Sequence, residues 1–520
     1  MKFDYDYIIV GSGFGGSVAA LRLSEKGYSV LVVEKGKRWS PEQFPKTNWN
    51  LKKWLWLPLF RFHGFFKITF MRHVGIISGV GVGGGSLVYG NTLPRPEGTF
   101  FQSGSWSGLA DWEKELEPHY SEAERMLGVT ENPGLYDSDE SLRQVASRYG
   151  KSDLFKPTRV AIFFGEPEQE VPDPYFRGDG PRRSGCNHCG GCMTGCRYNA
   201  KNSLDKNYLF FAEKRGARVL ERKRVTHIQP LRGKYGEHGY QVTFRDSIRF
   251  MKREGQCTSG GVILAGGALG TVRLLFDMKG KYLKRISDQL GSQIRTNSES
   301  IVLVHSRQKE KDFSKGVAIG SIFPPDKDTH LEAMRYASGS GFWKLTGVPL
   351  THGKTLPGRI LKLLWKLITR PLPWLRLYFC RDFARESVIL LFMQRLDSML
   401  SMSRGLFNLR SKISTGKPPS AFIPFAKELA EATAEVVDGT PFVMATEGLT
   451  GIPTTAHFLG GCVIGKNREE GVIDKDHKVF GYQNLFVCDG STISSNLGVN
   501  PALTIAAMTE RVISKIPLKK

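Results

Sequence analysis

The sequence lacks the features that would mark a membrane-spanning or exported chain. No stretch offers the roughly 20 apolar residues of a spanning helix, since basic residues such as Arg61, Lys67 and Lys366 interrupt the longest apolar runs. Residues 1–10 carry no basic segment, long apolar run or small-residue cleavage site, so we expect no cleavable signal. We therefore predict a cytoplasmic protein, at most peripheral on the inner face of the membrane.

Acidic residues are also scarce. Lys and Arg number 73 against 50 Asp and Glu, which gives a formal net charge of +23. Such an excess suits nucleic acid, an anionic membrane surface or acidic ligands. No helix-turn-helix, zinc-finger or RNA-binding motif is found, so we expect no nucleic-acid partner. The basic residues alternate with Trp, Leu and Phe in two stretches, which favours a lipid surface.

Internal repeats and disordered linkers are missing too, so we expect the 520 residues to divide into about two compact domains. Glycine, by contrast, is abundant. The 58 glycines lie in discrete clusters rather than in a period. This distribution indicates tight turns and a backbone that approaches a ligand closely.

The first glycine cluster follows a predicted strand. Residues 6–10 form a short apolar run, and an apolar helix pattern follows the cluster through residue 23. In this strand, turn and helix, Gly11 permits the tight turn, Gly13 lets the backbone reach a pyrophosphate, and Gly16 lets the helix pack against the strand. The helix N-terminus would face the phosphates.

A second strand, residues 29–33, ends in Glu34. This acid has the offset expected for a hydrogen bond to a ribose 2′-OH. The sequence therefore predicts a dinucleotide site. FAD is favoured over NAD by the position of the motif near the start of the chain and by a second glycine cluster, residues 79–86, which bares a surface for a flat or charged group.

Four segments together resemble one family. The opening motif and residues 83–91, 262–271 and 489–501 are similar to glucose-methanol-choline oxidoreductases, most of all to the bacterial cholesterol oxidases among them. The likeness is thinner between residues 300 and 440. It implies FAD as cofactor, and the positions carried over as FAD-binding are Gly11, Gly13, Gly16, Glu34, Gly83, Gly84, Ser86, Asn91, Val225, Asp489, Gly490 and Asn500.

The expected fold is α/β, with a discontinuous Rossmann-like FAD-binding domain and a second, α+β substrate domain in which helices back a β-sheet. We assign the FAD-binding domain to residues 1–45, 72–110, 200–290 and 445–520. The substrate domain would comprise residues 46–71, 111–199 and 291–444.

The resemblance also implies a catalytic pair, His457 and Asn500. A hydride leaves an alcohol carbon for flavin N5 only as the hydroxyl proton is removed or polarised. A neutral His can accept that proton, whereas Asn can only donate a hydrogen bond and orient the oxygen. We predict these two roles. Some family members also isomerise the enone product with a carboxylate base; the sequence names no such residue here.

Four cysteines, Cys186, Cys189, Cys192 and Cys196, form a C-x2-C-x2-C-x3-C run. In a reducing compartment thiols or metal ligands are expected rather than disulfides. The spacing matches a ferredoxin run, although Arg197 replaces the usual Pro and there is no second run. One hypothesis is that the run holds an iron–sulfur cluster. Two alternatives stay open: a zinc site, or a glycine-rich hairpin whose thiols are inert.

Residues 350–385 are predicted to form a mobile, membrane-facing lid. Basic residues at 359, 362, 366 and 370 would share one face of a helix, with Ile360, Leu361, Leu364, Trp365 and Ile368 away from it. This pattern suits an anionic lipid interface, or else a core-facing helix with a solvated basic side. The aromatic stretch 54–70 adds an apolar mouth.

Three functional hypotheses follow. The first is oxidation of a sterol or another lipid alcohol with O2 as acceptor. The second is a dehydrogenase of the same substrate class that passes electrons through the cysteine-bound cluster to a quinone or carrier protein. The third is a non-redox flavin lyase or photodecarboxylase, because fold alone does not fix chemistry.

Overall fold

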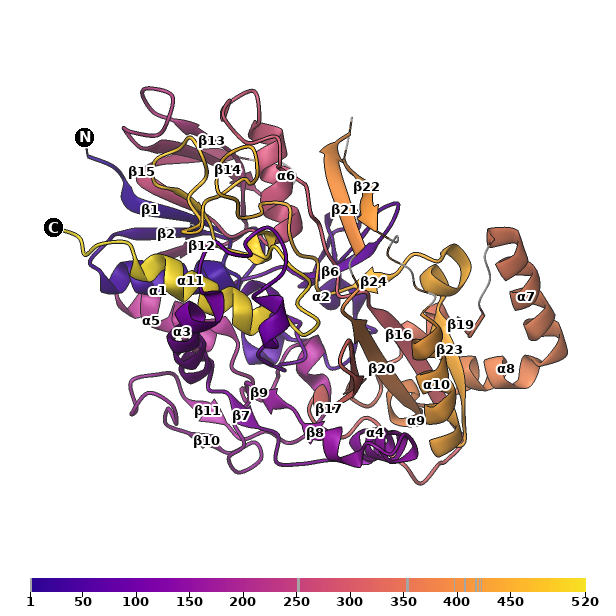
Figure 1. Ribbon diagram of the computed structural model, residues 1–520. Helices are drawn as coiled ribbons and strands as arrows, with labels where there is room; N and C mark the ends of the chain where they lie inside the picture. Colours follow the sequence, from indigo (N-terminus) through magenta and orange to yellow (C-terminus); the bar gives the residue numbers. More distant parts are fainter. Residues whose placement is uncertain are drawn as a thin grey trace.

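The computed structural model describes residues 2–249, 253–351, 355–396, 398–405, 408–416, 419, 421 and 423–520. Within these residues the strands form two large sheets of seven strands each. Figure 1 shows the first sheet at the upper left, close to both termini, and the second at the lower right. The predicted α/β class, with a Rossmann-like first domain and a second domain of sheet and helices, is confirmed. The segment boundaries of the two domains remain a prediction.

The first sheet has the order β12-β2-β1-β15-β14-β13, and β25 pairs with the second half of β15. Its strands are β1 (Tyr5–Val10), β2 (Val30–Val33), β12 (Arg218–Leu220), β13 (Lys223–Pro230), β14 (Tyr240–Asp246), β15 (Glu254–Leu264) and β25 (Leu485–Val487). The pairings β12·β2, β2·β1, β1·β15 and β15·β25 are parallel. Parallel strands are covered on both faces, which explains why β1 and β2 are short, continuous apolar runs.

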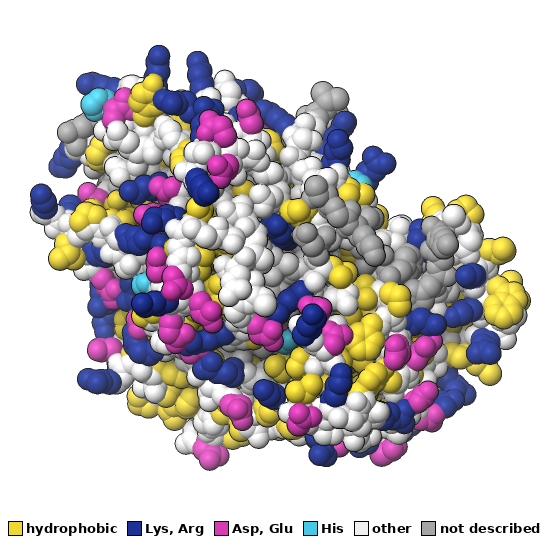
Figure 2. All heavy atoms as spheres, viewed as in Figure 1, with side chains coloured by type: hydrophobic (Ala, Val, Ile, Leu, Met, Phe, Trp, Pro, Cys, Tyr) yellow, Lys and Arg dark blue, Asp and Glu magenta, His cyan; other side chains and the backbone are white. Residues whose placement is uncertain are grey.

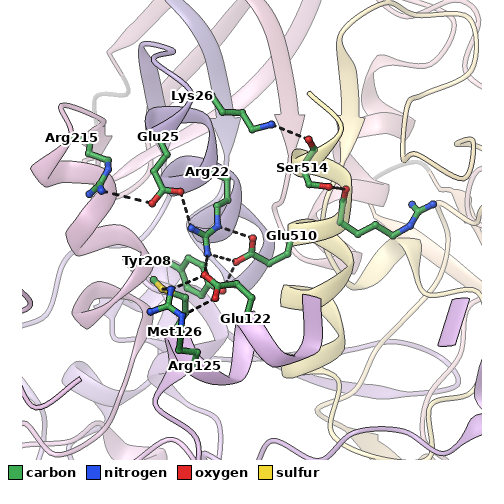
Figure 3. A network of polar contacts seen from close by, with 11 residues as sticks. Arg22, Glu25, Lys26, Glu122, Arg125, Met126, Tyr208, Arg215, Glu510 and Ser514 are labelled. Atoms are coloured by element: carbon green, nitrogen blue, oxygen red, sulfur yellow. Dashed lines mark hydrogen bonds and ion pairs between the residues drawn. The ribbon is translucent and has the colours of Figure 1, made fainter. Parts of the chain in front are cut away.

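Helices α1 (Phe14–Glu25), α3 (Trp112–Leu127), α5 (Tyr208–Lys214) and α11 (Ala502–Ser514) pack together beside this sheet. A polar network joins them (Figure 3). Nε of Arg22 lies 2.7 Å from Glu510, and the hydroxyl of Tyr208 donates to the same carboxylate at 2.7 Å. Arg22 also contacts Glu122. A buried charge is tolerated only with partners, so these contacts fix how the four helices meet.

The second sheet has the order β19-β23-β16-β20-β18-β17-β8. Its strands are β8 (Lys156–Pro157), β16 (Ser300–Ser306), β17 (Ile319–Asp326), β18 (Thr329–Met334), β19 (Gly347–Pro349), β20 (Ser387–Gln394) and β23 (Gly439–Met444). The neighbouring strands are antiparallel. Helices α4 (Asp137–Arg148) and α10 (Pro424–Val436) cover one face and share an apolar core with it.

Further elements lie outside the two large sheets. They are α2 (Leu51–Trp54), α6 (Ala268–Met278), α9 (Phe383–Glu386) and the strand groups β3 (Trp56–Leu57) with β4 (Phe62–His63), β5 (Phe66–Phe70) with β6 (Gly75–Gly79) and β24 (Thr454–Thr455), β7 (Thr130–Glu131) with β9 (Arg159–Val160), β10 (Glu170–Val171) with β11 (Arg183–Ser184), and β21 (Ser398–Arg404) with β22 (Leu409–Gly416). Within the residues described, no helix combines the length and apolarity needed to cross a bilayer.

The predicted lid contains two helices, α7 (Leu356–Thr369) and α8 (Pro371–Phe379), and its residues 352–354 lie outside the described residues. The helices protrude at the right of Figure 1. The apolar stripe of α7 faces solvent: Leu361 is 70% and Ile368 78% exposed. Arg359, predicted on an outer basic face, is instead buried and donates to the carbonyl oxygen of Leu449 at 2.9 Å. The alternative of a core-facing apolar stripe is therefore wrong.

Candidate active site

A cavity of about 840 Å³ lies between the two sheets, and its wall includes the first glycine loop. Gly11 and Gly13 both line it. A Cβ on Gly16 would lie 2.0 Å from the carbonyl oxygen of Gly11, so this glycine serves the packing of α1 on β1 and does not reach the cavity. A Cβ on Gly13, in contrast, would meet no atom within 4 Å. The chain therefore leaves open space for a ligand at the N-terminus of α1.

Glu34, at the end of β2, holds this loop in place. Its Oε2 accepts hydrogen bonds from the backbone N–H of Ser12 at 3.1 Å and from its hydroxyl at 2.8 Å, and its Oε1 accepts from the N–H of Gly36 at 2.8 Å. Glu34 also lines the cavity. The acid predicted to bind a ribose thus lies beside the first glycine loop.

The second glycine cluster packs directly on the first. A Cβ on Gly84 would lie 2.6 Å from the Cα of Gly13. Gly84 lines the cavity, but Gly83, Ser86 and Asn91 do not. Ser86 donates to the carbonyl of Gly83 at 2.7 Å and so closes the turn. The side-chain amide of Asn91 is buried and has no hydrogen-bond partner within the described residues.

Three more predicted positions line the same cavity: Val225, Asp489 and Gly490. Burial raises the pKa of Asp489, whose carboxylate accepts from the hydroxyl of Thr271 at 2.5 Å. Gly267, close by on the wall, leaves space where a Cβ would be, as Gly13 does. A wall without side chains around a helix N-terminus fits the pyrophosphate and the flat rings of FAD.

His457 faces the cavity and has a carboxylate behind it. Its Nδ1 lies 2.8 Å from Oε1 of Glu299, and both side chains are buried. Glu299 also accepts from the hydroxyl of Thr455 at 2.5 Å and from the N–H of Ala456 at 2.9 Å. Burial alone would raise the pKa of Glu299, but the imidazole and these donors hold it below its ordinary value. Burial alone would lower the pKa of His457, yet the carboxylate raises it.

Asn500 lines the cavity together with His457. Its Nδ2 donates to Oε2 of Glu332 at 3.5 Å, and the other carboxylate oxygen lies 3.0 Å from Nε2 of His330. Glu332 is completely buried on β18. The loop that carries Asn500 is fixed by Asn297, which donates to the carbonyl of Val499 at 2.8 Å. The second sheet thus positions the carboxamide.

A further buried carboxyl lies behind Glu299. Glu447, in the π-helix Thr446–Thr450, accepts from the hydroxyl of Ser300 at 3.1 Å and from the N–H of Thr454 at 3.4 Å. Burial raises the pKa of Glu447 to about 8. Glu447 is therefore largely protonated at neutral pH, whereas Glu299 is ionised.

Sequence reasoning missed Glu299, Glu332 and Glu447, because none of them belongs to a motif that carries the family likeness. One signal was present. Glu299 directly precedes the apolar run of β16, and Glu332 stands inside β18, where an acid is unusual unless it has a buried partner.

The cysteine run does not form a metal site in the structure. Within the described residues, no group of three or more Cys, His, Asp or Glu side chains is arranged to hold a metal ion. Burial raises the pKa of Cys189 to about 12 and that of Cys192 also above its ordinary value. Neither Cys186 nor Cys196 lines the cavity. The hypotheses of an iron–sulfur cluster and of zinc have no support, and the alternative of inert thiols in a glycine-rich turn fits.

The polar contacts around the cysteines are structural. The ammonium group of Lys201 is buried and donates to the carbonyl oxygens of Leu87 at 3.2 Å, Tyr89 at 3.0 Å and Cys192 at 2.9 Å. Burial lowers the pKa of Lys201 to about 8. Lys201 thus ties the cysteine loop to the segment that follows the second glycine cluster.

Comparison with known proteins agrees with this site. Two family models described as GMC oxidoreductase match residues 180–278 and 402–509, and an NAD(P)-binding Rossmann-like domain matches residues 9–43. The chain is 48% identical to a cholesterol oxidase of Acinetobacter baumannii, with 100% of this chain and 95% of that protein covered. It is 44% identical to a cholesterol oxidase of Mycobacterium tuberculosis, with 100% and 92% covered.

More distant proteins also resemble the chain. A long-chain-alcohol oxidase of Arabidopsis thaliana, FAO4B, is 23% identical over 98% of this chain and 67% of its own length. The crystal structure of pyridoxine 4-oxidase from Mesorbium loti superposes with a TM-score of 0.62 at 15% identity, over 98% of this chain and 99% of that one. The resemblance deduced from the motifs is confirmed: the chain belongs to the GMC oxidoreductase family and is an FAD-dependent oxidoreductase that acts on CH–OH groups.

Proposed function

We propose that the enzyme oxidises a sterol or another lipid alcohol and passes the electrons to O2. The proposal rests on one observation: His457, Asn500 and an apolar wall all line the same cavity. The wall is supplied by the second sheet, where Ile301 pairs with Leu391 and Leu303 with Ile389, and all four side chains line the cavity. A rigid apolar ring system would bury its surface there. Two relatives with more than 40% identity are named cholesterol oxidases.

FAD, when bound, supplies the acceptor for the hydride of the carbinol carbon. The side chains of the protein remove or polarise the proton of the substrate hydroxyl. With Glu299 at 2.8 Å, Nδ1 of His457 keeps its proton, and Nε2 is left with a lone pair for the substrate hydroxyl. Asn500 orients the same oxygen with its amide, which is itself held by Glu332. FAD would be held by the backbone around Gly11, Gly13 and Gly84, and by the wall at Val225, Asp489 and Gly490.

The decisive experiment is an anaerobic titration with cholesterol and a panel of long-chain alcohols, followed by flavin absorbance. We expect bleaching by at least one lipid alcohol. His457→Ala should bind FAD normally and lose this bleaching, whereas Glu435→Gln, a change in an exposed surface pair, should bleach like the wild type. If no alcohol of the panel bleaches the wild-type flavin, the lipid-alcohol substrate is wrong.

O2 is proposed as acceptor because the two relatives with more than 40% identity are named oxidases, and because the cysteine run, which lies within the described residues, is not arranged to hold a metal. Oxygen uptake with release of peroxide, at a rate equal to that of alcohol oxidation, is the expected result. An assay for iron and acid-labile sulfide on anaerobically purified protein should find neither. If stoichiometric iron and sulfide are present, the dehydrogenase hypothesis replaces this one.

We also propose that α7 and α8 rest on an anionic lipid surface. Besides Leu361 and Ile368, Phe379 is 81% exposed, and Arg370 and Arg376 are exposed among these apolar side chains. Figure 2 shows hydrophobic and basic side chains together on this protrusion. An amphipathic helix with its apolar side outward binds lipid through that side, and nearby basic residues add attraction to anionic headgroups.

The entrance to the cavity has the same character. Phe70, which lines the cavity, is 67% exposed, and Leu59 beside the lining residue Pro58 is 87% exposed. Aromatic contacts connect this region to the lid: Trp54 packs on Trp343 at 5.9 Å, and the short helix Phe342–Thr346 contacts α8. A water-insoluble alcohol could therefore pass from the lipid to the cavity without crossing bulk water.

Vesicle sedimentation tests the surface. The wild type should sediment with vesicles that contain phosphatidylglycerol and less with pure phosphatidylcholine. The double variant Leu361→Asp, Ile368→Asp should lose most of this binding and keep activity on a detergent-dispersed substrate. Leu518→Asp, equally exposed but distant in the chain, is the control. Equal sedimentation of both variants would contradict the proposed surface.

A further inference from the structure

The π-helix Thr446–Thr450 carries a buried carboxyl that the proposed chemistry does not use. Its Glu447 is completely buried. Glu447 is not among the described residues that line the cavity, so it can act on the reaction only through other side chains. A π-helix is rare, and where one occurs it often lies at a functional site. The contacts of Glu447 show which part of the site it reaches.

The carboxyl joins two segments of the chain. Its Oε2 accepts from the hydroxyl of Ser300 at 3.1 Å, and its Oε1 accepts from the N–H of Thr454 at 3.4 Å. Ser300 directly follows Glu299, and Thr454 lies three residues before His457. Glu447 therefore holds the segment that supplies the carboxylate to the segment that supplies the imidazole.

The same two segments meet a second time at Glu299. Its carboxylate accepts from the hydroxyl of Thr455 at 2.5 Å and from the N–H of Ala456 at 2.9 Å. The hydroxyl of Thr455 in turn accepts from the backbone N–H of His457 at 2.9 Å. Without Glu447, two buried donors would lose their acceptor, which is costly, so the segments would shift. The 2.8 Å contact between Glu299 and Nδ1 of His457 depends on both sets of bonds.

The π-helix is itself fixed in place. A Cβ on Gly448 would lie 2.9 Å from Cγ2 of Val348, so the helix packs directly against β19. Arg359, from the lid helix α7, donates to the carbonyl oxygens of Leu449 at 2.9 Å and Thr450 at 3.2 Å. The carboxyl of the π-helix is thus held between the second sheet and the lid, and its position is well defined.

We infer that Glu447 is a positioning residue of the oxidation, which fixes Glu299, and through it the imidazole of His457, by joining the two segments that carry them. The inference rests on the proposed role of His457 as the base. Burial raises the pKa of Glu447 to about 8, and the charge of Glu299 adds to the rise. The acid is therefore neutral at neutral pH, and the negative charge beside the imidazole stays on Glu299 alone.

A neutral carboxyl offers one hydrogen-bond donor and one acceptor, and the amide of Gln offers both as well. The hydroxyl of Ser300 can take either role, so Glu447→Gln keeps the two contacts, whereas Glu447→Leu removes them. Comparing these two variants separates the hydrogen bonds of Glu447 from its mere bulk.

The first measurement is anaerobic stopped-flow flavin reduction in the holoenzyme, with an alcohol that bleaches the wild-type flavin. Glu447→Leu should reduce its flavin about ten- to a hundredfold more slowly, because a misplacement of about 1 Å can have this effect. The substrate Kd should change little, since the apolar wall is untouched. Glu447→Gln should restore most of the lost rate. Ser306→Ala is the control, because it removes a buried hydroxyl at the far end of β16, which donates to the carbonyl of Val437 at 2.6 Å, and should react like the wild type.

The second measurement needs no substrate. Nitrogen NMR of the holoenzyme labelled at histidine, with His457→Ala to identify the signal, reports which ring nitrogen carries the proton. The neutral ring should be a single tautomer, protonated on Nδ1, in the wild type and in Glu447→Gln. Glu447→Leu should show a second tautomer, because the imidazole is no longer fixed on Glu299.

The outcomes are distinct. If Glu447→Leu keeps both the wild-type rate and the single tautomer, or if Glu447→Gln is as slow as Glu447→Leu, the inference is overturned. If no alcohol bleaches the wild-type flavin, the proposed substrate is wrong, and the tautomers alone decide the role of Glu447. Should Glu447→Leu fail to fold, Ser300→Ala removes one of the two contacts, and a wild-type rate with a single tautomer in that variant would equally refute the role.

Discussion

Replacing Glu299 with Gln tests the core of the proposed mechanism. The change keeps the size of the side chain and removes the charge 2.8 Å from Nδ1 of His457. A buried hydrogen bond to a charged group contributes about 1.5–3 kcal/mol. Because each 1.4 kcal/mol of barrier changes a rate about tenfold, we expect the rate of flavin reduction to fall roughly 10- to 150-fold. Substrate binding should change less, since Glu299 supports the imidazole and not the apolar wall.

The pH profile provides the more specific signature. The carboxylate raises the pKa of His457, and a base must be unprotonated to act. Without that charge the pKa falls, so the acidic limb of kcat/KM should move to lower pH while the maximum decreases. Stopped-flow flavin reduction over a pH series measures both, with FAD content as a control for folding. An unchanged rate together with an unchanged acidic limb would refute the role of Glu299.

Four other substitutions have clear expected outcomes. Gly13→Ala should fold but bind FAD weakly, because the added Cβ enters open cavity space. Gly15→Ala should impair folding, because its Cβ would lie 1.7 Å from the carbonyl oxygen of Cys488. Flavin titration and thermal melting distinguish the two effects. Glu447 keeps its proton in the folded state because its pKa is raised to about 8, whereas in the unfolded chain it ionises near 4.5. The free energy of unfolding of the wild type should therefore fall as pH rises between these two values, by up to about 1.4 kcal/mol per pH unit. Urea unfolding over a pH series should show this decline for the wild type and not for Glu447→Gln. Glu510→Gln should lower the free energy of unfolding by about 1–3 kcal/mol, because Arg22 and Tyr208 lose a charged partner; a melting temperature equal to that of the wild type would contradict the network.

Sequence patterns predicted those parts of the fold that depend on residues close together in the chain. The strand, glycine turn and helix at the start of the chain are β1 and α1, because the turn glycines and the apolar runs are adjacent in sequence. His457 and Asn500 were expected from the family resemblance, and both line the cavity. Their carboxylate partners, Glu299 and Glu332, could not be predicted, since only tertiary packing decides which buried acid meets which side chain.

Helix α7 of the lid shows a second limit of prediction from sequence. Periodicity located α7 correctly but could not decide which side faces the protein, and Arg359 turned inward to bond carbonyl oxygens. The cysteine spacing could not by itself establish a metal site, for a similar reason. A spacing describes how closely thiols follow one another, whereas a metal site also needs their sulfurs to converge, which those of the described residues do not.

The strand β25 and the helix α11 come from the last part of the sequence, yet they pack against its first elements. The sheet that begins with the first residues receives its last parallel strand from Leu485–Val487, and α11 packs beside α1. Asp489 and Asn500, both on the cavity wall, are synthesised only after that strand. The cavity wall therefore joins segments from residues 10–15 and residues 489–505, so it is complete only when β25 and α11 are in place against the first sheet.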